Sequence, residues 1–198
     1  MPITHSVIII PGLGDNTTYL NLLKNSWKKY NLDIVVYSMG WQDNTKSFRQ
    51  KLDGLLKLID KLHSSGEKIS LVGTSAGASA ALNAFVERRD IIHKVVNVCG
   101  RVRVGPESGF WSFVLRTKKS PSFAESVRAF ENKEKLLNKD DKKRIMTIMP
   151  LFGDQLVPSS TVPIKGATNK KIYTGEHILS IAIAMTVYSP LKYFLLDN

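Results

Sequence analysis

Residues 69–79 constrain the fold of this chain more than any other stretch. An apolar run with β-branched residues leads into Gly73-Thr74-Ser75-Ala76-Gly77, and a helical pattern follows. A serine on such a sharp turn between a strand and a helix is exposed above the sheet, where it can act as a nucleophile. A side chain at Gly73 or Gly77 would collide with the adjacent strand or helix. The stretch therefore predicts a parallel α/β sheet with Ser75 as the candidate nucleophile; an ordinary turn in such a sheet is the alternative.

Apolar strands alternate with helical patterns along the rest of the chain. We expect strands at residues 6–10, 33–37, 69–72, 95–99, 145–149 and 171–173. We expect helices at residues 17–30, 48–62, 76–89, 121–138 and 178–187. This alternation predicts an α/β fold with a mainly parallel six-stranded sheet between two helix layers, a three-layer α/β/α sandwich. Ligands bind at the carboxyl ends of the strands in such sheets, so the loops there are where a site is expected.

Composition limits the class of protein. The 198 residues, 43% of them hydrophobic, can form one domain over residues 1–198 with a sizeable core. No run approaches the ~20 apolar residues of a membrane span, and the N-terminus lacks the basic region of a signal peptide. We therefore expect a cytoplasmic protein without a transmembrane segment. The single cysteine, Cys99, excludes an internal disulfide framework and a cysteine-based metal cluster.

The net charge of +11 raises the question of a nucleic-acid partner. The basic residues are scattered, however, and the densest run, residues 133–144, also contains Glu134, Asp140 and Asp141. The sequence has no aromatic-rich nucleic-acid motif. We therefore expect a solvated basic surface and no nucleic-acid partner.

A nucleophilic serine needs a histidine base, and the chain has four histidines. His177 alone follows an expected strand at its carboxyl end and lies at a helix start. His5, His63 and His93 lie at the amino ends of strands or away from the site, and we expect them on the surface. His177 is therefore the candidate base.

The base needs a carboxylate that holds it in one tautomer. Asp154 is the first carboxylate after the fifth strand and lies on a glycine turn; an ordinary turn aspartate is the alternative. Glu176 is the weaker candidate, because it adjoins His177 and would have difficulty reaching round to the imidazole. No carboxylate follows the fourth strand, so we choose Asp154.

The order Ser75, Asp154, His177 is the chain order of the α/β-hydrolase triad, and here the sequence resembles that family. The resemblance covers nearly the whole chain. Residues 11–15, Pro-Gly-Leu-Gly-Asp, are similar to the family's oxyanion loop, which often reads His-Gly-x-Gly. The resemblance implies that the backbone amides of Leu13 and Ala76 form the oxyanion hole.

The sequence also departs from the family pattern. Pro11 replaces the usual loop histidine, and Thr74 stands where many members carry histidine. The two leading strands of the full fold are missing, and the lid insertion, at about residues 101–143, is short. The chain therefore resembles the small, nearly cap-less serine hydrolases with a minimal α/β-hydrolase fold. Gly12-Leu13-Gly14-Asp15 is also similar to a motif of the acyl-protein thioesterases and related carboxylesterases.

The lid-like insertion contains Phe110, Trp111 and Phe113 next to glycines. Large aromatic residues beside glycines are suited to a mobile apolar flap over the acyl group, so these three are candidate substrate-binding residues. The alternative is that the rings plug the edge of the sheet. Because the insertion is short, we expect a shallow pocket that prefers acyl groups of about two to six carbons.

Together these features predict a serine hydrolase that cleaves a small-molecule ester or thioester through an acyl-enzyme, without a cofactor or a metal. Amidase and acyltransferase chemistry would use the same residues. The alternative from a different class is a non-catalytic binding or scaffold protein with this fold, because a fold does not fix a function.

Overall fold

A computed structural model describes residues 4–197, so residues 1–3 and 198 of the predicted domain lie outside the described residues. Its sheet has six strands in the order β2-β1-β3-β4-β5-β6, and each neighbouring pair is parallel. The strands are β1 (His5–Ile10), β2 (Leu32–Val36), β3 (Lys68–Thr74), β4 (Ile92–Val98), β5 (Ile145–Pro150) and β6 (Thr168–Ile172). The predicted parallel six-stranded sheet is confirmed.

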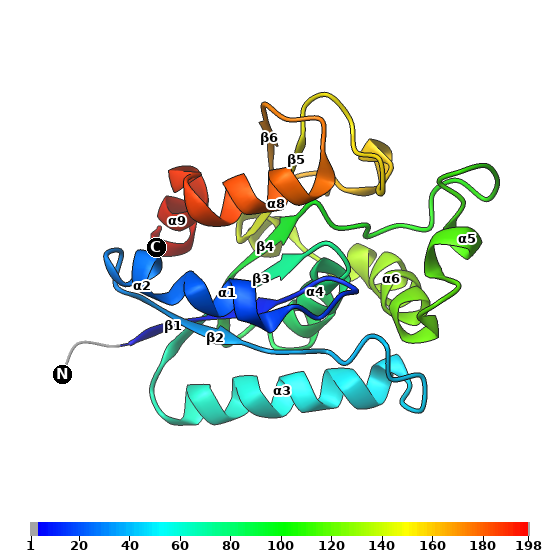
Figure 1. The fold of residues 1–198 in the computed structure, drawn as a ribbon. Coiled ribbons are helices and arrows are strands. Elements are labelled where there is room, and N and C mark those ends of the chain that lie inside the picture. The colour runs from blue at the N-terminus through cyan, green and yellow to red at the C-terminus, as the bar shows by residue number, and fades with distance from the viewer. Residues whose placement is uncertain (1–3, 198) are drawn as a thin grey trace.

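Helices cover both faces of this sheet (Figure 1). One face carries α3 (Phe48–Ser64), α4 (Gly77–Glu87) and α6 (Pro121–Lys133). The other carries α1 (Thr17–Leu22), α2 (Lys24–Lys28), α8 (His177–Thr186) and α9 (Ser189–Leu196). The shorter elements are α5 (Phe113–Thr117), α7 (Lys139–Lys143) and the 3₁₀ helices η1 (Glu134–Leu136) and η2 (Ser159–Thr161). The three-layer arrangement is therefore as predicted.

The apolar runs of the strands reflect burial on both faces. In β1, Ile8 and Ile10 pack under α3 and α4, whereas Val7 and Ile9 pack under the helices of the opposite layer. Side chains alternate between the faces of a strand, so a strand covered on both sides must be apolar at every position. This double burial holds β1 and β3 in the middle of the molecule, directly below the loops that end in the candidate site.

Two predicted helices are broken in the structure. The helix expected at residues 17–30 divides at Leu23 into α1 and α2, where the Ser26 hydroxyl donates to the Leu23 carbonyl (2.8 Å). A serine that bonds its local backbone in this way competes with the regular helix ladder. The helix expected at residues 121–138 ends at Lys133, and Asn138 caps a separate helix, α7, by accepting from the Asp141 amide (2.8 Å).

Candidate active site

Ser75 lies on the turn between β3 and α4, with a backbone φ of +51°. This left-handed conformation is unfavourable for a residue with a side chain, and such strain gathers at functional sites. A Cβ at Gly73 would meet the backbone of Ala78, and a Cβ at Gly77 would meet the carbonyl of Ile10. The predicted collisions at both glycines are confirmed, so the sharp turn requires glycine on each side of Ser75.

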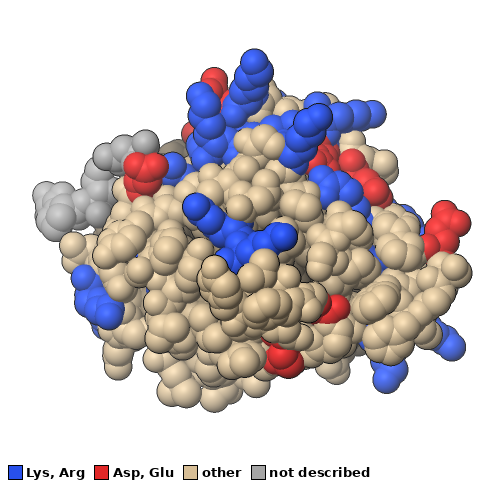
Figure 2. All heavy atoms as spheres, turned by 90° about the horizontal axis from the view of Figure 1, so that it is seen from above, with Lys and Arg blue, Asp and Glu red and all other residues tan. Residues whose placement is uncertain are grey.

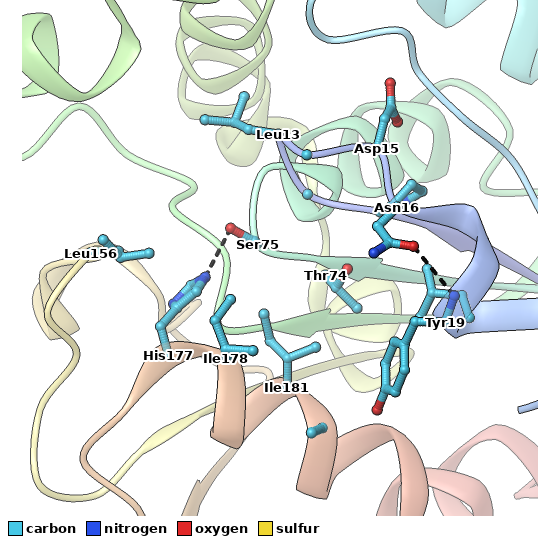
Figure 3. Close-up of a pocket in the computed structure, with 15 residues that line it drawn as sticks. Leu13, Asp15, Asn16, Tyr19, Thr74, Ser75, Leu156, His177, Ile178 and Ile181 are labelled. Atoms are coloured by element: carbon cyan, nitrogen blue, oxygen red, sulfur yellow. Dashed lines mark hydrogen bonds between the residues drawn. The ribbon is translucent and has the colours of Figure 1, made fainter. Parts of the chain in front are cut away.

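Three side chains from distant parts of the chain meet above this turn. The Ser75 hydroxyl lies 2.9 Å from Nε2 of His177, and Nδ1 of His177 lies 2.6 Å from Oδ2 of Asp154. Figure 3 shows the Ser75–His177 contact at the wall of a pocket. The His177 and Asp154 side chains are almost fully buried, which protects their contact from water. The arrangement can pass the serine proton to a base that a carboxylate orients.

The loop after β5 holds the Asp154 carboxylate in place. Its second oxygen, Oδ1, accepts hydrogen bonds from the amides of Leu156 (2.7 Å) and Val157 (2.9 Å). Gly153, with a φ of +97°, makes the turn that brings these amides round. Both carboxylate oxygens are therefore occupied, one by the loop and one by the imidazole, and charge-assisted bonds of this kind fix orientation.

Glu176, the weaker candidate acid, has a different role in the structure. Its side chain caps the N-terminus of α8 by accepting from the Leu179 amide, and this bond holds the pKa of the carboxyl below its ordinary value. Its other oxygen accepts from Nε2 of Gln155 (2.6 Å), whose Oε1 in turn accepts from the His177 amide (3.1 Å). Gln155, which the sequence analysis did not select, thus joins the acid loop to the start of α8.

The loop at residues 11–15 lies against the serine. A Cβ at Gly12 would be only 2.9 Å from Cβ of Ser75, so this position needs glycine. Leu13 and Ala76 line a pocket that Ser75 also lines. In the described part of the chain, neither amide donates a hydrogen bond to another protein group. Both residues therefore lie near Ser75, where the resemblance places the oxyanion hole, and that role stays a prediction.

Asp15 fixes the position of that loop. Its carboxylate accepts from the backbone amides of Met39 (3.3 Å) and Trp41 (3.0 Å), and the Trp41 indole donates to the Pro11 carbonyl (3.1 Å). Trp41 is fully buried, so the loop is tied at both ends to a rigid part of the core. The sequence places Asp15 in a motif but does not indicate its role, because its partners lie more than twenty residues away.

Two pockets meet at Ser75. The larger, about 450 Å³, lies between the loop at residues 11–15, α1 and α8, and Figure 3 shows Ile178 and Ile181 facing it. The smaller, about 130 Å³, lies beside Leu13 and Ala76. Leu13, Ser75 and Leu156 line both pockets. A substrate bound across Ser75 can therefore place one part in each pocket.

The three aromatic residues of the insertion line neither pocket. Phe113 is the first residue of α5 and is buried in the core that includes α6, while Phe110 and Trp111 are exposed on the loop before it. This placement corrects the expectation that all three cover the acyl group. The sequence could not show that a short helix begins at Phe113 and turns its ring inward.

The other histidines lie at the opposite end of the sheet or on the surface. His5, expected on the surface, is instead buried, and its Nε2 lies 2.9 Å from the Ser70 hydroxyl. His93 is half-buried with its ring edge-on to that of His5, at 5.6 Å between centroids. Burial, followed by the charge of Lys68, lowers the pKa of each imidazole to about 4. His63 is exposed at the end of α3.

Residues 4–197 offer neither a metal site nor a single membrane-spanning helix. These residues contain no group of three His, Cys, Asp or Glu side chains placed to hold a metal ion. No single helix among them is long and apolar enough to cross a membrane; α8 and α9 reach that length only as a pair bent by 54°, and both bury side chains in the core. Cys99 is buried, and burial raises the pKa of its thiol.

Comparisons with known proteins identify the fold. No family model matches the sequence, and no curated protein sequence matches it. A structure described under "LipS and LipT, two metagenome-derived lipolytic enzymes" matches with a TM-score of 0.68 and 10% identity, over 99% of this chain and 95% of that one. A monoacylglycerol lipase from Paleococcus ferrophilus matches with a TM-score of 0.66 and 14% identity, over 98% and 95%.

The metagenomic carboxyl esterase MGS0156 matches with a TM-score of 0.70 and 15% identity, over all of this chain and 77% of that one. At these identities the likeness shows the fold alone. The chain has the α/β-hydrolase fold in a small form, as the order of its motifs predicts.

Proposed function

We propose that this protein is a serine hydrolase that cleaves a carboxylic ester or thioester through an acyl-enzyme at Ser75. The observation that carries the proposal is the continuous contact from the Ser75 hydroxyl through His177 to Asp154, at the junction of two pockets. The activities named for the three similar structures, lipolytic enzyme, monoacylglycerol lipase and carboxyl esterase, are in keeping with it.

The reaction would proceed in two halves. Oγ of Ser75 attacks the carbonyl carbon while its proton passes to Nε2 of His177, and Asp154 stabilises the imidazolium that forms. The amides of Leu13 and Ala76 donate to the carbonyl oxygen as it gains negative charge. His177 then gives the proton to the departing alcohol or thiol. In the second half, water attacks the acyl-enzyme as its proton passes to His177. His177 then returns that proton to Oγ of Ser75 as the bond to the acyl group breaks and the acid leaves.

The position of His177 indicates which part of the substrate enters which pocket. The leaving oxygen or sulfur must lie within hydrogen-bond reach of Nε2, and His177 lines the larger pocket but not the smaller one. The alcohol or thiol part would therefore occupy the larger pocket, where Leu20, Ile178 and Ile181 offer apolar surface. The acyl part would occupy the smaller pocket. Its volume of about 130 Å³ favours a short acyl group.

The test is hydrolysis of hexyl butyrate, which offers an apolar alcohol and a short acyl group. We expect turnover by the wild type and none above background for Ser75→Ala, since alanine can replace serine without filling extra space. Ser65→Ala, at an exposed serine after α3, is the matched control and should behave like wild type. A folded Ser75→Ala variant that still hydrolyses the ester would refute the nucleophile. A wild type that binds but hydrolyses neither esters nor thioesters would favour a binding protein.

A further inference from the structure

Two arginines, Arg101 and Arg116, line the smaller pocket. Arg101 is 2% exposed and lies just beyond the end of β4. Its nitrogens donate to the backbone carbonyls of Arg103 (3.2 Å), Trp111 (3.0 Å) and Val104. These are neutral acceptors. Within residues 4–197, neither Arg101 nor Arg116 forms a salt bridge with a carboxylate.

Arg101 is thus a buried cation that forms no salt bridge with a carboxylate of residues 4–197. Removing a charge from water is costly unless an opposite charge compensates it. Burial, followed by the charge of Arg116, lowers the pKa of Arg101 to about 10, and the charge of Glu131 opposes this only in part. Glu131 itself accepts from the Val104 amide (3.2 Å). A guanidinium has five N–H donors, so three bonds to carbonyls leave donors for a ligand.

Backbone carbonyls also hold the side chain of Arg116 in place. Its Nε donates to the Phe110 carbonyl (3.0 Å), and its Nη2 donates to the Gln155 carbonyl (3.2 Å). Its guanidinium lies over the Phe110 ring, 3.9 Å from the centroid. These contacts join the insertion to the loop that carries Asp154. They orient the guanidinium without neutralising its charge. They also show that Phe110 contacts Arg116, whereas the sequence suggested that it covers the substrate.

Both arginines line the pocket to which the proposed function assigns the acyl group, together with Leu13 and Ala76. Its volume of about 130 Å³ corresponds to about four water-sized groups, which is enough for a two-carbon linker and a carboxylate. Phe123 and Val157 supply apolar wall for the linker. Guanidinium binds carboxylate through paired, charge-assisted bonds.

The charge of the whole protein favours the same kind of ligand. The net charge is +11, and Figure 2 shows more Lys and Arg than Asp and Glu on the face that it presents. A field of this sign attracts anions and raises their rate of association. The effect reaches any anion, so the two arginines of the pocket must supply the selectivity.

We propose that the acyl group of the substrate is short and ends in a carboxylate, which Arg101 and Arg116 bind, so that the substrate is the half-ester or half-thioester of a small dicarboxylic acid. This proposal deepens the proposed function and rests on it. It assigns the substrate class from the acyl pocket, and it leaves the apolar alcohol or thiol in the larger pocket.

The test compares two esters that differ in charge and almost not in shape, hexyl hydrogen succinate and hexyl succinamate. For the wild type we expect kcat/KM to be about tenfold or more higher for the half-ester, and this ratio to fall with added salt. Arg116→Gln should bring the ratio close to one, and because both esters are measured on the same variant, a general loss of activity cancels in the ratio. Arg128→Gln is the matched control, since Arg128 is exposed on α6 outside the pocket, and it should keep the wild-type ratio.

Arg101→Lys is a second variant, because removing Arg101 altogether would release three backbone carbonyls of its loop. Lysine keeps the charge but not the paired donors, so we expect a reduced ratio that remains above one. A wild-type ratio at or below one would overturn the proposal. So would a preference for the half-ester that survives Arg116→Gln combined with Arg101→Lys.

Binding to Ser75→Ala separates this proposal from the proposed function. Calorimetry should show tighter binding of hexyl hydrogen succinate than of hexyl succinamate, and Arg116→Gln in the same background should remove the difference. If that preference is present but the wild type hydrolyses no ester, the anion pocket stands and the hydrolase proposal fails. If the wild type hydrolyses hexyl butyrate but neither assay shows a preference for the half-ester, the hydrolase proposal stands and the anion pocket fails.

Discussion

Strand β3 has a serine–histidine contact at each end, and only one of them forms a candidate active site. At the carboxyl end, Ser75 lies 2.9 Å from His177; at the amino end, Ser70 lies 2.9 Å from His5. All four side chains are buried or half-buried. The contact between the hydroxyl and the ring is therefore not what distinguishes the two ends.

The difference lies in the groups around each pair. His177 has the carboxylate of Asp154 on its other nitrogen, whereas His5 has His93 beside it and the positive charge of Lys68 near it. Ser70 is fully buried in the regular strand, whereas Ser75 lies on a strained turn beside two pockets. A serine–histidine contact indicates a nucleophile only where a carboxylate, a strained turn and open space accompany it.

Removing the two histidines should give the sharpest contrast. His177→Gln should lower kcat for ester hydrolysis by about 10⁴-fold or more, the size reported for the loss of a triad member in serine proteases. His5→Gln should leave kcat within about twofold, because glutamine can still bond the Ser70 hydroxyl and the site is at the other end of the strand. Steady-state kinetics on folded variants checks both, and equal losses in the two variants would remove the distinction.

The carboxylates offer the next contrast. Asp154→Asn should lower kcat by about 10⁴-fold, since the amide favours the wrong imidazole tautomer. Glu176→Gln should change kcat by only a few-fold and lower stability slightly through the weaker cap of α8. Kinetics and chemical denaturation measure the two effects. A Glu176→Gln variant more damaged in kcat than Asp154→Asn would show that the wrong acid was chosen.

The two imidazoles at the amino end of the sheet, those of His5 and His93, should make the stability of the protein depend on pH. Since the pKa values of His5 and His93 are about 4 in the folded chain and ~6.5 in an unfolded one, the unfolded state binds more protons between these values. The contribution of these two neutral imidazoles to the free energy of unfolding is thus fully present above pH ~6.5 and is lost as the pH falls to about 4. After allowance for solvent screening, we expect a loss on the order of 2 kcal/mol.

The control for this pH effect is the variant with both His5→Gln and His93→Gln. Denaturation curves between pH 7 and 4 should fall less steeply for this variant than for the wild type. Identical pH dependence in the two proteins would show that the pair remains solvated or charged.

The smallest effect is expected at the insertion. Trp111→Ala should change kcat/KM for hexyl butyrate by no more than about twofold, because Trp111 is exposed and lines neither pocket. Ile181→Ala, in the larger pocket, is the contrasting variant and should weaken the preference for long alcohols, at ~0.8 kcal/mol per buried CH₂. A clear loss of kcat/KM for long esters in Trp111→Ala would instead support an aromatic flap over the substrate.

The sequence was most informative where a rule acts locally. Alternating apolar strands and helices predicted the sheet, and Gly73 and Gly77 predicted the turn that exposes Ser75, because both depend on the nearest residues. The order of Ser75, Asp154 and His177 predicted which side chains meet, since the carboxyl ends of parallel strands share one edge.

What the sequence did not reveal depends on long-range contacts. The buried position of His5 depends on Ser70, sixty-five residues away, and the pocket arginines depend on a loop without a regular pattern. The apolar aromatic residues of that loop suggested a lid, but the formation of α5 turned Phe113 into the core. Burial of polar groups is decided by partners that periodicity does not identify.

Labelling with a fluorophosphonate probe, located by peptide mass spectrometry, tests the central claim most directly. We predict one modified residue in the wild type, Ser75, with a labelling rate that falls about 10³-fold or more in His177→Gln and is unchanged in His5→Gln. Labelling at Ser70 or at another serine, or a rate at Ser75 that does not depend on His177, would contradict the account.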